Sequence, residues 1–221
     1  MIEPASSERI SLRKYRPDDR PRCLKIMAQA WPSLTIDRFD SLSMDWYSRL
    51  ATWKKVACVT ETPVGVIFGN VYHNLGARDS LKTSIAHLTI YMRMLLGIYG
   101  KIPHCLALIK GAMADERNIS KNSREVDGEI GLLVVDSTHR RMGIGRQLID
   151  SFLGHAKKKG ARKISVYTID PGSDWRFYEH YGFRKYSSFR DNFMSLVQNE
   201  EVKGIIYVFD IGRRESSRFQ E

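Results

Sequence analysis

Apolar and polar residues follow two periods along the chain, and these periods predict strands and helices in turn. Alternation with period two predicts a strand, whereas apolar residues that recur every three or four positions predict a helix. The expected strands are Arg9–Tyr15, Lys55–Thr60, Val64–Tyr72, Gly128–Val135, Lys163–Ile169, Phe183–Ser188 and Gly204–Ile211, with a loop between the last two. The expected helices are Arg20–Ala30, Ile36–Thr52, Leu88–Tyr99, His104–Ala114, Gly143–Lys159 and one within Trp175–Phe183 that Gly182 caps.

A long interval without a strand separates Val64–Tyr72 from Gly128–Val135. Hairpin loops usually have about 2–5 residues, so residues 73–126 predict a helical insertion that ends in a polar stretch. The strands Gly128–Val135 and Lys163–Ile169 are joined by a helix, and we therefore expect them to run parallel. We expect a single domain over residues 1–221, with loose tails at residues 1–7 and 212–221.

The segment Val134–Arg146 (VVDSTHRRMGIGR) combines a strand end, a polar turn and a glycine-rich helix start. Gly143 and Gly145 leave backbone N–H groups open where the helix begins, and the helix dipole favours an anion there. The neighbouring arginine side chains favour negative charge at the same place. The segment therefore has the chemistry of a pyrophosphate-binding site.

Two other kinds of phosphate-binding loop are excluded by spacing. A dinucleotide fingerprint requires a third glycine three residues after Gly145, and that position is Leu148. A P-loop requires Gly-Lys-Ser/Thr, and the candidate Gly100–Ile102 lacks both the hydroxyl and the earlier glycine, since Leu95 stands there. The pattern that remains is Arg140-x-x-Gly143-x-Gly145.

This pattern resembles the acyl-CoA signature of the GNAT superfamily of N-acetyltransferases. A second segment, Trp175–Phe183 (WRFYEHYGF), is similar to the superfamily's later motif, in which a helix carrying Phe-Tyr-Glu runs into a Gly-Phe turn. Both motifs occur in the order that the family requires, with one helix and one strand between them. The resemblance is specific over Gly128–Phe183, plausible over Arg9–Tyr72 and absent for the insertion.

The resemblance implies an α/β (mixed α+β) fold, with a mixed, mostly antiparallel sheet of about seven strands and helices on both faces. The two parallel central strands would splay apart to admit the pantetheine arm of acetyl-CoA, which is the co-substrate. Strand amides would bind the pantetheine, and the glycine-rich turn would bind the pyrophosphate. The implied coenzyme site comprises Leu133, Val134 (with its side chain in the core), Val135, Arg140, Arg141, Met142, Gly143, Ile144, Gly145, Arg146, Asp174 and Phe177. Asp174 departs from the asparagine or other polar residue that relatives often carry there.

Acetyl transfer to an amine requires a base for the amine and an acid for the leaving thiolate. A lysine-like amine is neutral in only about one molecule in a few thousand at neutral pH. In the resemblance, the motif tyrosine, Tyr178, lies near the thioester sulfur, and a phenol can donate a proton without carrying a charge. Tyr178 is therefore the candidate acid. The alternative is a buried tyrosine whose hydroxyl has only a structural partner.

Glu129 is the candidate base, because some protein-acetylating relatives carry a catalytic glutamate at the same offset before the signature. Strand alternation would place it on the face that meets the coenzyme, together with Gly131, Leu133 and Val135. Two alternatives remain open. Glu129 could face water at the strand end, or the base could be a neighbouring acid, Asp127 or Glu125.

The insertion and the early helices are expected at the end of the sheet opposite the pyrophosphate loop, where they would wall the acceptor pocket. Its candidate lining residues are Tyr91, Met92, Met94 and Tyr99. The alternatives are that this apolar stripe only packs, or that it forms the contact of a homodimer.

The formal net charge of +10 and the pI near 9.6 favour anionic partners, such as a polyphosphate coenzyme or nucleic acid. No helix-turn-helix, zinc-finger or RRM signature supports nucleic acid, so it is the lesser alternative. No membrane span is expected, because the longest apolar stretch, Leu88–Ile109, contains Arg93, Lys101 and Pro103.

The cysteines and histidines bear on the expected compartment and on metal binding. Cys23, Cys58 and Cys105 are scattered, without a Cys-x-x-Cys pair, which favours a reducing cytoplasm over a disulfide scaffold. The start of the chain has no apolar run, so no signal peptide is expected. The six histidines lack the spacing of metal ligands, and we expect no metal.

The sequence therefore predicts an N-acetyltransferase that moves an acetyl group from acetyl-CoA to a primary amine of a small molecule by direct attack. A protein acetyltransferase that acts on a lysine or an N-terminus is the alternative within enzymes. Glu129 favours the protein acceptor and the insertion favours the small amine. A non-catalytic acyl-CoA-binding sensor is the alternative outside enzymes.

Overall fold

The computed structural model describes residues 9–30, 38–72, 77–122 and 125–212. The expected tail at residues 1–7, and all but Gly212 of the expected tail at 212–221, lie outside the described residues. The strands are β1 (Ile10–Lys14), β2 (Trp53–Val59), β3 (Thr62–Val71), β4 (Gly128–Val135), β5 (Lys163–Asp170), β6 (Arg184–Asp191) and β7 (Val202–Asp210). The α-helices are α1 (Arg20–Ala30), α2 (Phe39–Leu50), α3 (Ala77–Leu95), α4 (Ile102–Asn122), α5 (Ile144–Lys158), α6 (Trp175–Tyr181) and α7 (Asn192–Gln198).

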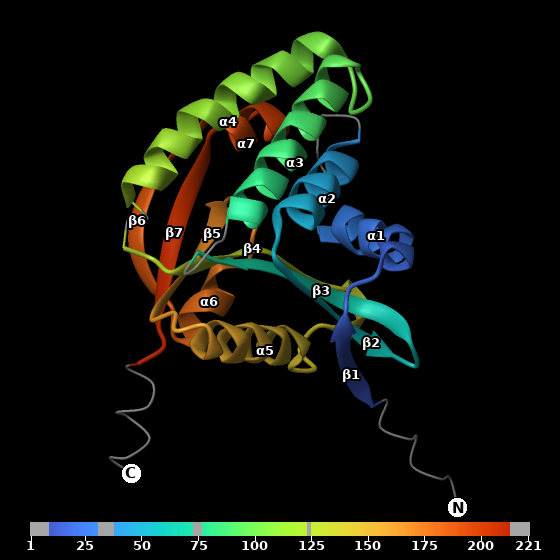
Figure 1. The fold of residues 1–221 in the computed structure, drawn as a ribbon, viewed down its shortest axis with the longest axis vertical. Coiled ribbons are helices and arrows are strands. Elements are labelled where there is room, and N and C mark those ends of the chain that lie inside the picture. Colours follow the sequence, from blue (N-terminus) through green and yellow to red (C-terminus); the bar gives the residue numbers. More distant parts are fainter. Residues whose placement is uncertain (1–8, 31–37, 73–76, 123–124, 213–221) are drawn as a thin grey trace, which may run out of the picture.

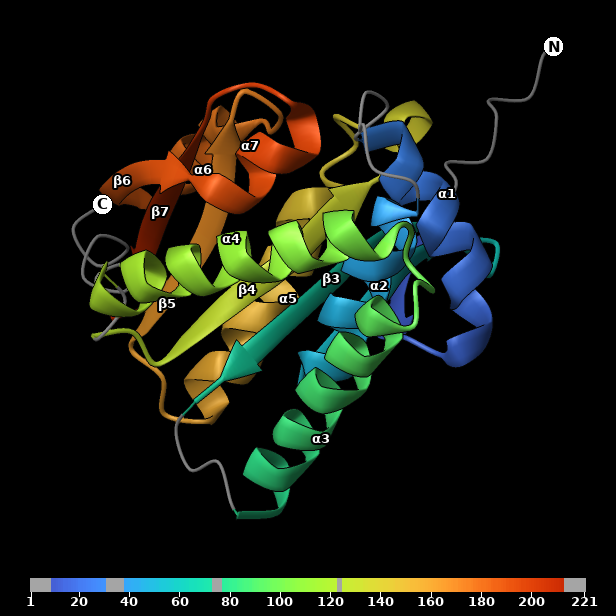
Figure 2. The same cartoon turned by 90° about the horizontal axis from the view of Figure 1, so that it is seen from above.

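The strands form one seven-stranded sheet in the order β1-β2-β3-β4-β5-β7-β6. Every neighbouring pair is antiparallel except β4 and β5, which are joined by α5 and run parallel. Helices α5 and α6 cover one face, and α1 to α4 with α7 cover the other (Figures 1 and 2). The predicted fold class is confirmed, including the parallel central pair and the helices on both faces.

Three hydrophobic clusters hold these layers together. The first packs α5 and α6 on the sheet around Leu148 and Phe152. The second packs α1 and α2 on the opposite face around Ile26 and Met44. The third lies beneath α3, α4 and α7, where Ile90 and Leu108 are buried with residues of α2 and β7. The insertion therefore carries part of the core.

A β-bulge in β4 overturns one expectation about its faces. The register between β3 and β4 shifts after Phe68, so that Gly131 is the extra residue between Ile130 and Leu132. Ile130 packs in the α5 cluster, whereas Leu132 and Val134 pack in the α1 cluster. Glu129 and Gly131 therefore do not share a face with Leu133 and Val135, as strict alternation predicted. The bulge breaks the period of two on which that prediction rested.

The connection between the last two strands was also predicted wrongly. It contains α7 rather than a loop alone, and Asp191 begins this helix by accepting the Met194 amide at 2.6 Å. The polar end of the insertion continues α4 as far as Asn122, instead of forming an irregular connection. Asp115 on α4 accepts the amides of Asn192 and Phe193, so each helix stabilises the end of the other.

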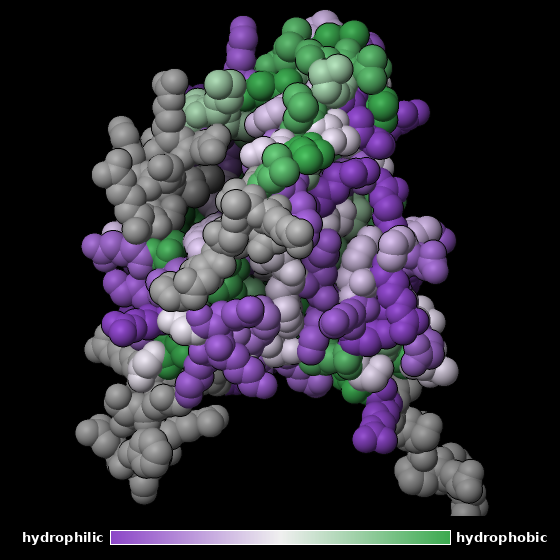
Figure 3. Space-filling view, in the orientation of Figure 1, coloured by the Kyte–Doolittle hydropathy of each residue, from purple (hydrophilic) through white to green (hydrophobic). Residues whose placement is uncertain are grey.

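Exposed apolar side chains gather around the turn between α3 and α4, at the upper end of the molecule in Figure 3. They continue along the outer side of α3 as Leu81, Ile85, Leu88, Met92 and Leu95. Within the described part of the chain, no helix is both long enough and apolar enough to cross a membrane.

Candidate functional site

Strands β4 and β5 pair at only three positions and then part. Gly128, Glu129 and Ile130 face Ile164, Ser165 and Val166, and no later pair joins the two strands. The Asp136 amide donates to the Val64 carbonyl on β3 at 2.8 Å. Because backbone groups alternate along a strand, the amides of Leu133 and Val135 point the other way, toward the gap. The gap is thus edged by a row of strand amides.

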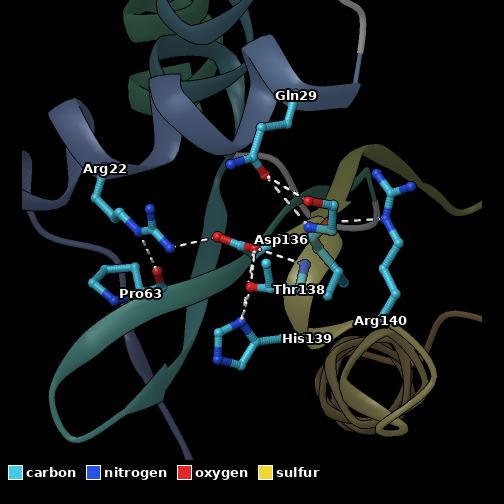
Figure 4. Close-up of polar contacts among 9 residues, drawn as sticks. Arg22, Gln29, Pro63, Asp136, Thr138, His139 and Arg140 are labelled. Carbon is cyan, nitrogen blue, oxygen red and sulfur yellow. Dashed lines mark hydrogen bonds and ion pairs between the residues drawn. The ribbon is translucent and has the colours of Figure 1, made fainter.

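A network of polar side chains holds the turn that follows β4 (Figure 4). Asp136 is only 2% exposed and forms an ion pair with Arg22 of α1, whose Nε donates to the Pro63 carbonyl at 3.1 Å. The Thr138 amide and hydroxyl donate to Asp136 at 2.9 and 2.6 Å. Burial opposes ionisation of Asp136, but the Thr138 hydrogen bonds and the Arg22 charge outweigh it and lower the pKa of this carboxyl.

The turn then enters α5 through a left-handed backbone. Gly143 has φ +75° and precedes the helix without any side-chain cap, so the first helix amides remain open to an anion. A Cβ on Gly143 would meet nothing within 4 Å, whereas a Cβ on Gly145 would lie 3.1 Å from the Phe177 ring. Gly143 is therefore required by its φ, and Gly145 by the close approach of α6.

The three arginines of the signature are exposed beside these amides. Arg140 donates from Nε to the Val135 carbonyl at 3.3 Å, and the Arg146 guanidinium lies 5.5 Å from the centre of the Tyr181 ring. Met142 is exposed, whereas Ile144 is buried in the core beneath α5. Positive charge and free amides thus meet at one end of the gap.

Tyr178 lies in the aromatic part of the core under α6. Its ring centre is 5.4 Å from that of Phe177, 5.7 Å from that of Phe183 and 6.5 Å from that of Tyr207. Burial raises the pKa of Tyr178, and Tyr47 and Asp174 add to the rise, so the phenol keeps its proton at neutral pH. Asp174 itself is exposed just before α6 and makes no capping bond.

Glu129 lies at the start of β4, on the face of the sheet opposite to the one that α5 and α6 cover. Its carboxylate accepts from the Asn70 side chain at 3.1 Å. Burial raises the pKa of Tyr47 to about 12, and the carboxylates of Glu129 and Asp191 contribute to that rise. Tyr47 is also the residue that a Cβ on Gly131 would meet, at 3.1 Å. The Tyr47 ring therefore lies over the bulge, with Glu129 nearby.

The two alternative bases have structural partners. Asp127 accepts the amides of Arg162 and Lys163 at 2.7 and 2.9 Å, which ties the start of β4 to the start of β5. Glu125 is paired with the Lys163 ammonium at 3.2 Å. These contacts engage Asp127 and Glu125 before β4 begins, whereas Glu129 is one of the three β4 residues that pair with β5.

A cavity of about 520 Å³ lies on the Glu129 face, between α2, α3, α4 and α7. Tyr47, above the bulge in β4, and Tyr167, which follows the last paired residue of β5, both line it. The cavity therefore reaches the place where the two strands separate. Most of its other lining residues are aromatic or aliphatic, including Phe39, Trp46 and Phe193.

Sequence reasoning identified only part of this cavity. Tyr91 and Met94 line it as expected. Met92 is 49% exposed on the outer side of α3, and Tyr99 is 2% exposed, with its hydroxyl donating to Asp45 at 2.7 Å. These two residues are therefore not part of the lining.

The lining residues that sequence reasoning missed include two buried carboxyls, Asp115 and Asp191, which are 4% and 2% exposed. The only local signal was Asp191-Asn192, which is typical of a helix start. Among the described residues, no group of three or more His, Cys, Asp or Glu side chains could hold a metal ion.

Comparison with known proteins agrees with this architecture. A sequence model described as the acetyltransferase (GNAT) family matches residues 21–183. The similar solved structures include Ard1 from Thermoplasma volcanium, which is 18% identical with a TM-score of 0.53, over 90% of this chain and 97% of that one. An N-acetyltransferase from Staphylococcus aureus Mu50 is 12% identical with a TM-score of 0.54, over 92% and 99% of the two chains.

A third structure, yncA from Salmonella typhimurium, is a putative acetyltransferase with its cofactor acetyl-CoA. It is 10% identical with a TM-score of 0.52, over 91% of this chain and 94% of that one. At these identities the likeness concerns the fold. No curated protein matches the chain by sequence.

The carboxyl pair in the cavity predicts a pH-dependent stability. Burial, with a contribution from Asp115, raises the pKa of Asp191 to about 7, against about 3.9 in an unfolded chain. The folded state then holds the proton more tightly, so stability is greatest at low pH and is lost as the pH rises through 7. Asp191→Asn cannot ionise, and we predict that it raises the Tm at pH 8 by at least about 3 °C, roughly 1 kcal/mol for a chain of this size.

The same variant should gain clearly less in Tm at pH 5, because the folded carboxyl still carries its proton there and only the first part of the loss between the unfolded and folded pKa values has occurred. Asp18→Asn, at an exposed position in the turn before α1, is the matched control. An equal Tm difference at both pH values for Asp191→Asn would contradict the raised pKa.

Proposed function

The chain belongs to the GNAT family of acetyltransferases, and we propose that it transfers the acetyl group of acetyl-CoA to a primary amine of a small molecule. One observation carries the proposal. The gap between β4 and β5 has a basic, amide-rich turn at one end and a cavity at the other. A thioester coenzyme bound at the turn and in the gap would deliver its acetyl group to the cavity.

The residues at the gap fit such a coenzyme. The amides of Leu133 and Val135 would bind the pantetheine arm, whose own amide groups match strand backbone. The first amides of α5 would bind the pyrophosphate, and Arg140, Arg141 and Arg146 would neutralise it. The close contact between Gly145 and Phe177 keeps α6 against this turn, because a side chain at Gly145 would push α6 away.

Acetyl-CoA supplies the acetyl group as a thioester, and the protein's part is to move two protons. We assign Glu129 as the base that takes a proton from the acceptor ammonium, directly or through a water molecule. The amine nitrogen then bonds to the acetyl carbon, the carbon–sulfur bond breaks, and the nitrogen releases its second proton, which restores the phenol that has protonated the sulfur. Tyr178 gives its proton to the departing sulfur, and the raised pKa of the buried phenol keeps that proton available at neutral pH.

The cavity supports a small molecule as the acceptor. Its volume of about 520 Å³ lies within the range of small-molecule sites, which are mostly apolar with a few placed polar groups. A protein acceptor would require an open groove for an extended segment instead. Glu129 and Tyr178 distinguish the proposed enzyme from a sensor that only binds the coenzyme.

The pyrophosphate site can be tested at Gly143. We predict that Gly143→Glu weakens coenzyme A binding at least tenfold more than Gly143→Ala, because it places a carboxylate against the phosphates. Both variants share the strain of a positive φ, and neither side chain would meet a neighbour at Cβ. Isothermal titration at modest ionic strength measures the two Kd values. Equal affinities would contradict the assignment.

The acid can be tested at Tyr178. We predict that Tyr178→Phe lowers kcat at least tenfold and changes the KM for acetyl-CoA less than twofold, because the hydroxyl acts only as sulfur departs. Tyr207→Phe is the matched control, since that tyrosine is buried in the same cluster and its hydroxyl donates to Glu179 at 2.9 Å. An unchanged kcat for Tyr178→Phe would remove the role.

The base can be tested by the pH dependence of the rate. We predict that Glu129→Gln lowers kcat/KM most at low pH and displaces the acidic limb of the profile toward the pKa of the acceptor amine, because no carboxylate remains to take the proton. Activity should recover toward high pH, where the free amine is already neutral. Glu125→Gln, on a neighbouring exposed acid, should keep the wild-type profile. A wild-type acidic limb in Glu129→Gln would exclude Glu129 as the base.

A further inference from the structure

The charge of the cavity wall is opposite to the charge of the chain. The whole chain has a formal net charge of +10. The described residues that line the cavity nevertheless include no lysine or arginine, and they include the buried carboxyls of Asp115 and Asp191. An interior that contains His87 but no lysine or arginine, and that retains two acids, is suited to a ligand that carries positive charge.

Apart from each other, these carboxyls have only neutral partners among the described residues. Asp115 accepts from the Asn192 amide at 3.0 Å, from the Asn192 side chain at 2.9 Å and from the Phe193 amide at 2.8 Å. Asp191 accepts from the Met194 amide at 2.6 Å. Among the described residues, no ion pair joins either carboxyl to a Lys, Arg or His nitrogen. Buried charges are usually paired, so this carboxyl pair can accept a cation from outside the chain.

The carboxyl pair lies too far from Glu129 to share one ammonium group with it. Glu129 is on β4 and Asp191 ends β6, and β5 and β7 lie between these strands in the sheet. Neighbouring strands are about 4.8 Å apart, so three spacings alone account for about 14 Å, and the register adds an offset along the strands, because Glu129 is level with Val208 of β7 and Asp191 with Val202. Tyr47 lines the cavity, and the charges of both Glu129 and Asp191 contribute to the raised pKa of its phenol.

We propose that the Asp115–Asp191 pair binds a second cationic group of the acceptor, which is therefore a diamine or polyamine with an apolar body. This inference rests on the proposed function, because it assumes that the other amine is the one acetylated near Glu129. The carbon chain between the two nitrogens lies against aromatic rings such as Trp46, Tyr91 and Phe193. These rings also attract a cation through their faces.

A further polar group in the wall fits a ligand with nitrogen atoms. The Tyr167 hydroxyl is buried and has no hydrogen-bond partner among the described residues, although Tyr167 lines the cavity. A buried hydroxyl without a partner is costly, and a ligand ammonium or amine can supply the missing bond. Tyr167 follows the point where β5 leaves β4, so it lies on the path between the coenzyme gap and the carboxyl pair.

The wild-type enzyme with acetyl-CoA tests the proposal without any substitution. The probes are α,ω-diamines with five to ten methylene groups, each compared with the monoamine in which one terminal NH₂ is replaced by CH₃, such as 1,8-diaminooctane and 1-aminononane. We expect kcat/KM for the diamine of best length to exceed that of its matched monoamine at least tenfold. Monoamines that react as well at every length would overturn the second cationic site.

Two variants assign the effect to the carboxyls. Asp115→Asn and Asp191→Asn should each lower kcat/KM for the best diamine at least tenfold and change that for its monoamine less than twofold. Asp18→Asn makes the same charge change at an exposed position and should leave both values unchanged. Equal losses for both amines would point to misfolding around α7 and would overturn the subsite.

The amine series distinguishes a failure of the second cationic site from a failure of the proposed acetyltransferase function. If monoamines and diamines are acetylated equally well, small-amine acetylation stands and the second cationic site is excluded. If acetyl-CoA binds and no amine of either series is acetylated, both proposals are excluded.

Discussion

The early parting of β4 and β5 is the constraint on which the rest of the site depends. Parallel strands with only three paired positions leave a row of strand amides without a strand partner in the described residues. Unpaired backbone groups are costly when buried, so this geometry requires a partner with its own amides or access to water. On one face Tyr47 packs over the bulge at Gly131, and on the other α5 and α6 pack on the sheet. The gap is thus built into the packing of both layers.

The turn after β4 is held by charge rather than by apolar packing. Arg22 and Gln29 reach from α1 to Asp136 and Ser137, and these contacts fix the start of the glycine-rich turn (Figure 4). Asp136 stays ionised although it is buried, because the Thr138 hydrogen bonds and Arg22 satisfy it. Arg22 is partly exposed, but its loss would leave the buried Asp136 carboxylate without its cation. The proposed phosphate site therefore depends on contacts that α1 makes with the residues just before it.

Much of the fold could be predicted from the sequence, because each element carries its own period and its own ends. Arg20–Ala30 and Gly128–Val135 were predicted with the bounds that α1 and β4 have. The bulge at Gly131 could not be predicted, since it depends on how β3 and Tyr47 pack against β4. Helix α7 was missed because its short sequence is held by Asp115, which lies in α4, far away in the chain.

The candidate site, like the fold, could be predicted from the sequence only in part. The coenzyme residues lie in two continuous segments, so local sequence was sufficient to propose them. The wall of the acceptor cavity is formed by residues of α2, α3, α4, β5 and α7. No local sequence pattern could predict that Asp115, Asp191 and Tyr47 line the same cavity. Such a cavity exists only once the insertion has packed on the sheet. The prediction from the insertion alone was therefore partly wrong, at Met92 and Tyr99.

Backbone hydrogen exchange with and without acetyl-CoA can decide whether the parted strands and the turn beside them form the coenzyme site. A coenzyme bound there slows exchange at residues 131–135 and 141–146, with little change in β1 and β2. Slower exchange confined to the basic surface of α5, with none in residues 131–135, would contradict this placement of the coenzyme.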